Sequence, residues 1–457
     1  MLAESIALNR FGLGARPGDP MPADPRRWLL SQLDTYEALP APWQSLPRTP
    51  VLAAGWVTQQ RALRQAPQEG RATLREEHRR KDAENYRAAV GARLASSLQS
   101  PAPFAERLVH FWANHFAVSV DKNPVTGLAG AFELDAIRPH ILGRFDDLLL
   151  AAVRHPAMLV YLDQERSIGP DSQAGRRARQ RQRNNGGLNE NLAREILELH
   201  TLGVRSGYTQ NDVTEFARAL TGSTLPDAGG VGADTPAPVE PFRFAANLHE
   251  PGERRVLGRS YAAGGEEQAR AILRDLAAAP ATADHIALKL ARHFVADEPP
   301  ASLVQRLAAT FKKSGGDLPA VYRELVLAPE TWAPGPGKFK SPWDWAVSSL
   351  RALDRRELPP QQAANLMNQL GQPVWRPGSP AGWGDAAGAW AAPDALLRRV
   401  EVAQRFGAQG AGQVDARALA PRVLPALADD TRQAIARSDS PATALALLLA
   451  SPDFLRR

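Results

Sequence analysis

Residues 188–204 read LNENLAREILELHTLGV, and their apolar positions recur with the three-to-four-residue spacing of an α-helix. Asn189 suits the N-cap of this helix, and Gly203 suits the position just after its last turn. A rotation of about 100° per residue gathers the apolar side chains into one stripe. The stripe consists of Leu188, Leu192, Ile196, Leu199 and Leu202.

The same spacing recurs on both sides of this segment. Residues 103–118 predict a second helix with an aromatic and aliphatic stripe, and residues 69–97 predict a long helix whose charged first half faces water. Only residues 241–244 and 254–257 predict a pair of strands. The sequence therefore predicts a mainly α, multi-helix, bundle-like protein with one small β-hairpin.

The chain of 457 residues is longer than one helical core usually supports, so we expect two or three packed subdomains. Residues 1–100 predict a helical region with the long charged helix. Residues 101–260 carry the motifs discussed below and the hairpin. Residues 261–457 predict a further helical region that is rich in Trp, Pro and Gly.

Composition excludes several classes of protein. Hydrophobic residues make up 44% and charged residues 23% of the chain, which is typical of a globular protein. No apolar run approaches the roughly 18 residues of a membrane span, so we expect none. The absence of cysteine excludes disulfides, thiolate nucleophiles and Cys-ligated zinc.

The first residues lack a basic segment followed by an apolar one, so the sequence predicts no signal peptide and a cytoplasmic location. A periplasmic location is the alternative, because a cysteine-free chain also suits an oxidising compartment.

The positive net charge of the chain is only a weak indication of nucleic-acid binding. The net charge is +6, and residues 173–187 hold five arginines without an acid, which predicts a solvated loop or an anion-binding lid. The helix that follows residue 204 begins with Asp212 and Glu215, the wrong charge for a phosphate-lined groove. Nucleic acid is therefore an unlikely partner.

Two predicted helices each place an ionisable residue in an apolar stripe. Glu195 falls inside the stripe of residues 188–204, and His115 falls inside that of residues 103–118. On the same helical wheels, His200 lies away from Glu195 and His110 points away from the stripe. A carboxylate directed into a core costs free energy unless it is paired or protonated.

We therefore expect one site that combines these two helices. Its candidate catalytic residues are His115, Glu195, Glu198 and Arg194. They could act as an acid–base pair, or a divalent metal could be bound by candidate ligands His115, Glu195 and His249. The alternative is a satisfied core, in which His115 donates to a carbonyl and Glu195 caps a buried helix end or pairs with an arginine.

Other signatures narrow the chemistry. The chain has no HExxH, GxSxG, Walker loop or Cys pair, which disfavours metalloproteases, serine hydrolases and nucleotide hydrolases. Tryptophans between residues 332 and 390 alternate with charged residues. Such rings can stack on sugars, but filling a core is their commoner role.

Several segments together closely resemble one bacterial family over nearly the whole chain, the family called domain of unknown function 1800. They are LNENLAREILELHTLGV with the following GYTQNDVTEFARALTG, FWANHFAVS at 111–119, HPAMLVYLD at 155–163, KFKSPWDWAVSSLRAL at 338–353 and WRPGSPAGW at 375–383.

This resemblance implies a partner. Genes of that family often lie beside those of the domain of unknown function 1501 family, which is similar to alkaline phosphatases and sulfatases.

Two hypotheses about function follow. The first is a hydrolytic enzyme with a His/Glu acid–base or metal site that acts on a polysaccharide or another polymer. The second is a non-catalytic binding or assembly partner of that phosphatase-like or sulfatase-like neighbour.

Overall fold

The computed structural model describes residues 2–181, 187–226, 240–334, 337–425 and 427–457, and helices dominate these parts of the chain. The predicted mainly α fold is therefore confirmed. The first α-helices are α1 (Leu2–Ser5), α2 (Pro25–Thr35), α3 (Thr49–Gln65), α4 (Arg71–Gln99), α5 (Pro103–His115), α6 (Asn123–Thr126) and α7 (Ala129–Ala131). The central α-helices are α8 (Phe145–Arg154), α9 (Pro156–Tyr161), α10 (Gln173–Gln180), α11 (Asn191–Glu195), α12 (Gln210–Leu220), α13 (Glu266–Ala278), α14 (Pro280–Phe294), α15 (Ala301–Ser314) and α16 (Leu318–Leu327). The last α-helices are α17 (Pro342–Ala352), α18 (Pro360–Gln369), α19 (Pro393–Gly410), α20 (Ala416–Val423), α21 (Asp429–Ala436) and α22 (Pro441–Ala450).

Short helical segments of other pitch join these elements. The π-helical segments are η1 (Ile6–Phe11), η4 (Phe132–Ile137) and η7 (Ile196–His200). The 3₁₀ segments are η2 (Ala41–Trp43), η3 (Gln68–Gly70), η5 (Arg138–His140), η6 (Gln164–Arg166), η8 (Pro329–Trp332) and η9 (Ala387–Ala389).

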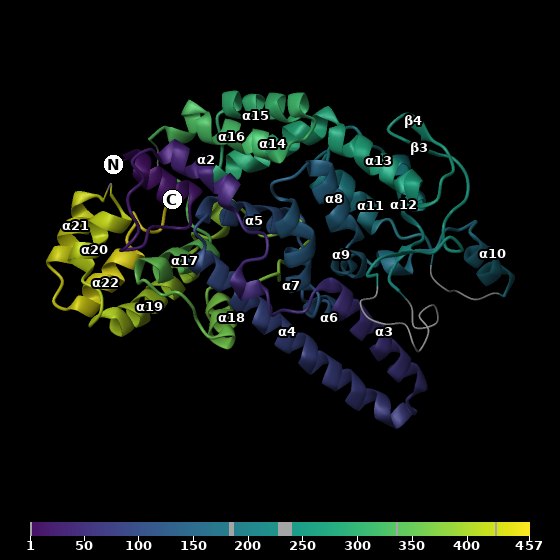
Figure 1. The fold of residues 1–457 in the computed structure, drawn as a ribbon, viewed down its shortest axis with the longest axis horizontal. Coiled ribbons are helices and arrows are strands. Elements are labelled where there is room, and N and C mark those ends of the chain that lie inside the picture. Colours follow the sequence, from purple (N-terminus) through teal and green to yellow (C-terminus); the bar gives the residue numbers. More distant parts are fainter. Residues whose placement is uncertain (1, 182–186, 227–239, 335–336, 426) are drawn as a thin grey trace.

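The helices form an elongated body from which one helical hairpin projects (Figure 1). That hairpin consists of α3 and the first half of α4, whose side chains there are largely exposed, as the sequence predicts. The second half of α4 is buried and packs against α17 and α18. Helices α19 to α22 gather at the end of the body that lies near both chain termini (Figure 1).

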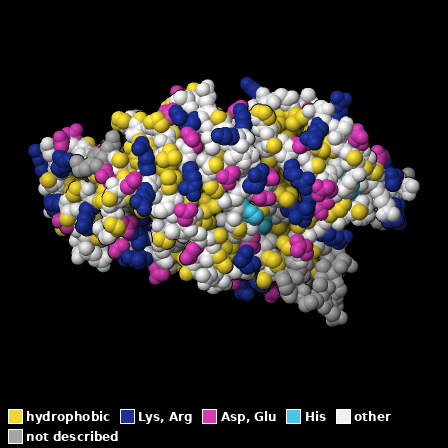
Figure 2. Space-filling view, turned by 45° about the horizontal axis from the view of Figure 1, so that its top comes forward, with side chains coloured by type: hydrophobic (Ala, Val, Ile, Leu, Met, Phe, Trp, Pro, Cys, Tyr) yellow, Lys and Arg dark blue, Asp and Glu magenta, His cyan; other side chains and the backbone are white. Residues whose placement is uncertain are grey.

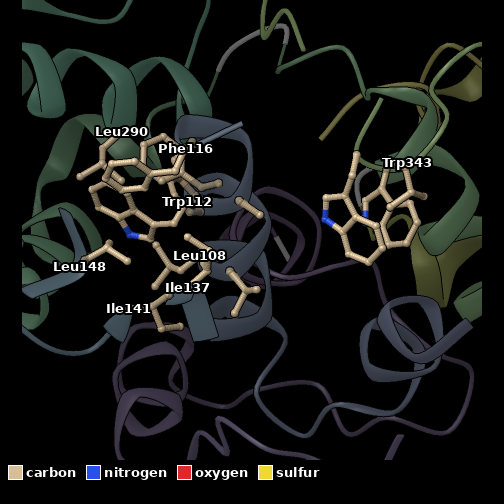
Figure 3. Packing of buried hydrophobic residues seen from close by; sticks show 14 of the residues in the cluster. Leu108, Trp112, Phe116, Ile137, Ile141, Leu148, Leu290 and Trp343 are labelled. Atoms are coloured by element: carbon tan, nitrogen blue, oxygen red, sulfur yellow. The ribbon is translucent and has the colours of Figure 1, made fainter. Parts of the chain in front are cut away.

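One cluster of buried apolar side chains runs from Ile6 to Phe454 through all three predicted regions. The division of the chain into subdomains stays a prediction. At the centre of the cluster lies α5, in which every residue except Asn114 is buried. Trp112 and Phe116 pack beside Leu290 on one side, while Trp343 lies apart from this group (Figure 3).

The packing around α5 corrects the prediction for His110. The sequence predicts that this residue points away from the apolar stripe, and in the structure it is nevertheless 8% exposed. The reason is that α5 is covered on a second face, where the His110 ring meets the Trp343 ring of α17 at a centroid distance of 5.5 Å. A central helix buries polar positions that an amphipathic surface helix would expose.

A buried ion-pair network fixes α5 to α17 and to the last residue. Nη1 of Arg107 lies 2.9 Å from Oδ1 of Asp344, and Nε of Arg457 lies 3.1 Å from Oδ2 of the same carboxylate. The two arginines hold the pKa of Asp344 far below its ordinary range, although burial alone would raise it. Buried charges that are paired in this way resist separation, because removing one partner leaves the others uncompensated.

Helix starts follow signals in the sequence. Helix α12 begins with a capping box, because the side chains of Thr209 and Asp212 each accept a hydrogen bond from the other's backbone N–H. At α17, the hydroxyl of Ser341 accepts a hydrogen bond from the backbone of Asp344, and proline follows at the first helical position.

The β-structure is small, as predicted, but the predicted strand pairing is wrong. Strand β1 (Ser223–Thr224) pairs with β2 (Arg243–Phe244), and β3 (Arg254–Val256) pairs with β4 (Arg259–Tyr261), both antiparallel. The second hairpin turns at Leu257 and Gly258, which both have positive φ angles as a tight hairpin turn requires. This turn follows β3 immediately and lets it pair with β4 instead of β2.

The arginine-rich residues 173–187 are partly helical. Helix α10 has no buried residue, and its N-cap is Ser172, whose hydroxyl accepts a hydrogen bond from the backbone N–H of Gly175. Arg183 and its neighbours at 182–186 lie outside the described residues. Positive and negative side chains alternate over the face of the molecule shown in Figure 2. Within the described residues, no helix is long and apolar enough to cross a membrane.

Candidate functional site

Helix α14 presents three titratable side chains on one face. His285, Lys289 and His293 follow one another at intervals of four residues, which places them on successive turns of the same side. This side faces α5, where the ring of His293 lies 5.4 Å from that of Phe111 and the ring of His285 lies 6.3 Å from that of His115.

A cleft of about 590 Å³ opens between α5, α14 and the chain segment 381–386. The cleft combines aromatic side chains with charges of both signs. Its lining residues are Phe111, Asn114, His115, Lys289, Arg292, His293, Asp297, Glu298, Ala381, Trp383, Gly384, Asp385 and Ala386.

A histidine–aspartate pair lies in the wall of this cleft. Nδ1 of His293 is 3.3 Å from Oδ1 of Asp385. Burial lowers the pKa of His293, and Asp385 offsets part of that shift. Burial would raise the pKa of Asp385, but the contacts with His293 and Lys338 outweigh it and keep this pKa below its ordinary value. At neutral pH the pair is therefore a neutral imidazole beside an ionised carboxylate.

The position of Asp385 is fixed by its neighbours. Nζ of Lys338, which is almost fully buried, donates to the backbone oxygen of Asp385 and lies 2.6 Å from Oδ1 of Asp297. Oδ2 of Asp297 in turn accepts a hydrogen bond of 2.8 Å from the backbone N–H of Ala387. These bonds hold the backbone at Asp385 and just after it.

The segment 381–386 is also tied to α5. The side chain of Asn114 accepts a hydrogen bond of 2.7 Å from the backbone N–H of Trp383 and donates one of 2.9 Å to its backbone oxygen. The preceding Gly382 has a φ of +80°, and an added Cβ would lie 2.4 Å from the backbone oxygen of Asn114. Only glycine allows so close an approach in this conformation.

A second, smaller cavity of about 80 Å³ lies beside the cleft, and we call it the chamber. The chamber and the cleft share Asn114, His293, Trp383, Gly384 and Asp385. The other residues that line the chamber are mostly buried. They are Arg93, His110, Ala113, Ala117, Val118, Ser341, Trp343, Asp344, Gln372, Val374, Trp375 and Pro377.

Lys289 lines the cleft one turn before His293. Its Nζ makes no hydrogen bond or ion pair with any residue that the structure describes. Burial lowers the pKa of Lys289 to about 8, and the charge of Asp385 opposes this shift. A half-buried amine without a fixed partner is free to interact with a bound molecule.

Comparison with known families bears on the whole chain. The model of one family, described as "Protein of unknown function (DUF1800)", matches residues 6–456. The chain belongs to this family. No curated protein and no solved structure matches it. In this DUF1800 protein, the segments FWANHFAVS and WRPGSPAGW meet at the cleft, because the first supplies Asn114 and His115 and the second supplies Trp383.

His115 of this DUF1800 protein is buried, as predicted, and lines the cleft. Its Nε2 lies 3.1 Å from the backbone oxygen of His200, and its ring packs edge-on against that of Phe116. Burial lowers the pKa of His115, and the charge of Lys289 lowers it further. This environment matches the satisfied-core alternative, in which His115 donates to a carbonyl.

Glu195 does not lie in the core, which corrects the helical-wheel prediction. The chain leaves α-geometry after Glu195, and Ile196–His200 form the π-helix η7. A π-turn contains an extra residue, so the side chains beyond it rotate relative to an α-helix. His200, which the sequence predicts on another face and which ends this segment, is fully buried as a result. Glu195 precedes the segment and is half-buried.

The remaining predicted site residues accompany Glu195 and not His115. Arg194 pairs with Glu190 at 3.3 Å and approaches Glu198 at 3.8 Å. Burial raises the pKa of Glu195, and the charge of Glu198 adds to the effect. The charges that act on His115 are instead those of Lys289, His200 and His285. The catalytic roles assigned to Arg194, Glu195 and Glu198 stay predictions.

The predicted metal ligands do not form a common site. Nδ1 of His249 lies 2.9 Å from the backbone oxygen of Thr221, next to the ring of Phe244. Across the described ranges, no three His, Asp or Glu side chains are grouped so that they could hold a metal ion. His115, Glu195 and His249 therefore do not fit a divalent metal, and we derive no chemistry from one.

Three titratable residues of the cleft were missed in the sequence, namely Lys289, His293 and Asp385. The spacing of His285, Lys289 and His293 in one predicted helix is a visible signal, because it repeats a titratable residue every fourth position. Asp385 lies in a Gly-rich and Ala-rich segment without periodicity, so no pattern in the sequence connects it with His293.

Proposed function

We propose that this DUF1800 protein is a hydrolytic enzyme in which His293 is the general base. The observation that carries the proposal is the His293–Asp385 pair in the wall of an open cleft. Asp385 accepts the Nδ1–H of His293 and so leaves Nε2 as the basic atom. Nε2 is buried and has no hydrogen-bond partner within the described part of the chain.

The proposed step balances as a simple hydrolysis. His293 Nε2 removes one proton from a water molecule, whose oxygen forms a bond to the electrophilic atom of the substrate. The bond to the leaving group breaks, and the leaving group takes the proton from His293. Lys289 stabilises the negative charge that develops on the substrate, because its amine lies in the same cleft one turn away.

The cleft suits a polar and extended substrate, such as a polysaccharide. Trp383 and Phe111 supply aromatic faces, and Arg292 and Glu298 supply exposed charges of opposite sign at the same opening. Sugars combine apolar ring faces with hydroxyl groups, so they are bound by this combination of side chains.

The experiment is a hydrolysis screen with chromogenic glycosides, phosphates, sulfates and carboxylic esters. We expect the purified protein to hydrolyse at least one class, and His293→Gln to lower kcat by about 10²-fold or more. His78→Gln, on the projecting hairpin, is the matched control and retains the wild-type rate. A folded His293→Gln protein with the wild-type rate, or a wild-type protein that hydrolyses none of the compounds, would contradict the proposal.

The same screen separates this proposal from the site predicted around Glu195. Glu195→Gln abolishes activity if the predicted acid–base role of Glu195 is correct. This substitution leaves the residues that line the cleft unchanged, because the charged neighbours of Glu195 are Glu198 and Arg194. The ratio of the two activity losses therefore shows which carboxylate or imidazole acts in catalysis.

A second candidate function is that of a binding partner for a phosphatase-like or sulfatase-like protein. It is favoured by α10, which has no buried residue and carries three arginines, with Arg181 directly after its end. Arg179 pairs with Asp171 at 2.7 Å, whereas Arg177 has no ion pair among the residues that the structure describes. Co-purification of the two proteins, lost on replacing Arg177 and Arg181 by Ser, tests this function. Wild-type protein that does not co-purify at micromolar concentration contradicts it.

A further inference from the structure

Three ring nitrogens beside the chamber lack a hydrogen-bond partner throughout the described ranges. They are Nε1 of Trp343, Nδ1 of His110 and Nε2 of His293. Trp343 and His110 are only 5% and 8% exposed. A buried polar atom without a partner is destabilising, so three such atoms around one cavity point to a molecule inside it.

The tautomer of His110 follows from its neighbour Ser97. The hydroxyl of Ser97 lies 2.8 Å from the backbone oxygen of Arg93 and 3.1 Å from Nε2 of His110. A carbonyl oxygen can only accept, so the single hydroxyl proton is directed to Arg93. The Ser97 oxygen must then accept a hydrogen bond from His110, which therefore carries its proton on Nε2. Nδ1 of His110 is left as an acceptor.

The tautomer of His293 follows in the same way. Its Nδ1 faces the ionised carboxylate of Asp385, which can only accept, so the imidazole proton lies on Nδ1. Nε2 of His293 is then an acceptor too. Burial lowers the pKa of both histidines, which keeps both rings neutral at neutral pH. Among its three ring nitrogens, the chamber thus has two acceptors and one donor, the indole N–H of Trp343. Arg93 also lines the chamber, but its Nε lies 3.1 Å from Oε2 of Glu133.

This combination selects the chemistry of the bound molecule. A simple anion has no proton to give to the two imidazoles, and a simple cation cannot accept from Trp343. The charged groups at the chamber already have partners. Asp344 binds Arg107 and Arg457, Arg93 pairs with Glu133, and Asp385 pairs with His293. Water offers two protons and two lone pairs, and a water molecule needs only about 10–15 Å³ of such a cavity.

We propose that the chamber holds ordered water bound to Trp343, His110 and His293, and that this water is the nucleophile of the hydrolysis. The inference rests on the proposed function, since it assigns the source of the water that His293 activates. His293 lines both the chamber and the cleft, so the activated oxygen attacks a substrate bound in the cleft. One proton of the water passes to Nε2 of His293 and then to the leaving group, as in the step above.

The first test is a high-resolution crystal structure of the wild-type protein. We expect a water molecule within hydrogen-bond distance of each of the three ring nitrogens. A chamber without ordered water, or one that holds an anion on these atoms, would overturn the inference.

The second test uses Trp343→Phe, which removes the indole donor and keeps an aromatic ring. We expect kcat to fall about tenfold with KM unchanged, because one hydrogen bond of about 1.4 kcal/mol to the water is lost. Trp345→Phe on the same helix is the matched control. It also removes an indole N–H donor, which bonds to the backbone oxygen of Leu449 away from the chamber. In added methanol, Trp343→Phe should raise the ratio of methanolysis to hydrolysis product, because methanol then competes better with the less firmly bound water. An unchanged product ratio together with an unchanged kcat contradicts the nucleophilic role of this water.

The two proposals fail in different ways. If His293→Gln keeps full activity, the assignment of His293 as the general base is wrong, whatever the chamber contains. If His293→Gln is inactive while the chamber holds no water and Trp343→Phe is fully active, His293 acts on water from the open cleft and only the chamber inference is lost.

Discussion

His293 and Asp385 meet with Nδ1 and Oδ1 at 3.3 Å, although one residue belongs to α14 and the other to a segment without regular structure. The contact joins the cleft and the chamber, because both residues line both cavities. It also fixes the imidazole tautomer, since an ionised carboxylate accepts the Nδ1 proton. The central claim of a general base at Nε2 depends on this one contact.

The first prediction concerns the pH dependence of activity. Because a general base must be neutral, activity should be lost as the pH falls through the pKa of His293. Burial places that pKa below the ordinary 6.5, so the acid limb of kcat/KM should lie below pH 6.5. Asp385→Asn should lower kcat, because the amide no longer demands the Nδ1–H tautomer. An acid limb above pH 7 would contradict this assignment.

The second prediction concerns the bonds between Asn114 and Trp383. Asn114→Ala removes the acceptor of the Trp383 N–H, so hydrogen exchange at that amide should become about tenfold faster. The amide of Trp390 is an internal control, since it bonds to the backbone of Ala387. Equal acceleration at both amides would mean that the whole segment loosens, and no change at Trp383 would contradict the role of Asn114.

The third prediction concerns the stability of the buried ion-pair network. Asp344→Asn leaves Arg107 and Arg457 without their carboxylate, so the free energy of unfolding should fall by about 3–5 kcal/mol. Asp394→Asn is the matched control, because its pair with Arg398 is exposed and contributes about 0.5 kcal/mol. Urea denaturation measures both. A similar loss of unfolding free energy in the two variants would show that the ion-pair network contributes little to stability.

The fourth prediction concerns stability in acid. Burial lowers the pKa of His155 and of His200 to about 3, whereas the unfolded chain titrates near 6.5. The unfolded state therefore binds more protons below pH 6.5, and stability present at neutral pH is lost on acidification. Between pH 7.5 and 5 the loss should be about 2 kcal/mol for each histidine.

The variant His155→Asn isolates one of these contributions. Nδ1 of His155 caps α9 by accepting from the backbone of Ala157, and an asparagine oxygen can replace that acceptor. The pH dependence of unfolding should then weaken by about 2 kcal/mol over the same interval. An unchanged dependence would show that His155 is not buried in its neutral form.

The helical content of this protein could be predicted because apolar spacing and capping residues are local properties. The capping box at Thr209 and Asp212 is such a local signal, and the apolar spacing around His115 likewise predicts the burial of that residue. The position of Glu195 could not be predicted, because the helical wheel assumes one continuous α-helix over residues 188–204. In the structure the α-helix spans only Asn191–Glu195 and is followed by a π-turn. The strand pairing failed for a similar reason, since the turn at Leu257 and Gly258 depends on backbone conformation.

The candidate site was harder to predict than the fold. His293 could be suspected from its spacing with Lys289 and His285, whereas Asp385 could not. Its place depends on long-range contacts, namely the bonds of Asn114 to Trp383 and of Lys338 to Asp385. Such contacts join segments that the sequence alone does not bring together.

The most direct measurement of the central claim is the ¹⁵N NMR spectrum of the histidine rings at neutral pH, assigned for His293 by comparison with His293→Gln. We expect a neutral ring with its proton on Nδ1, and loss of that preference in Asp385→Asn. A ring protonated on Nε2, or a doubly protonated ring at pH 7, would contradict the assignment of His293 as the general base of this protein.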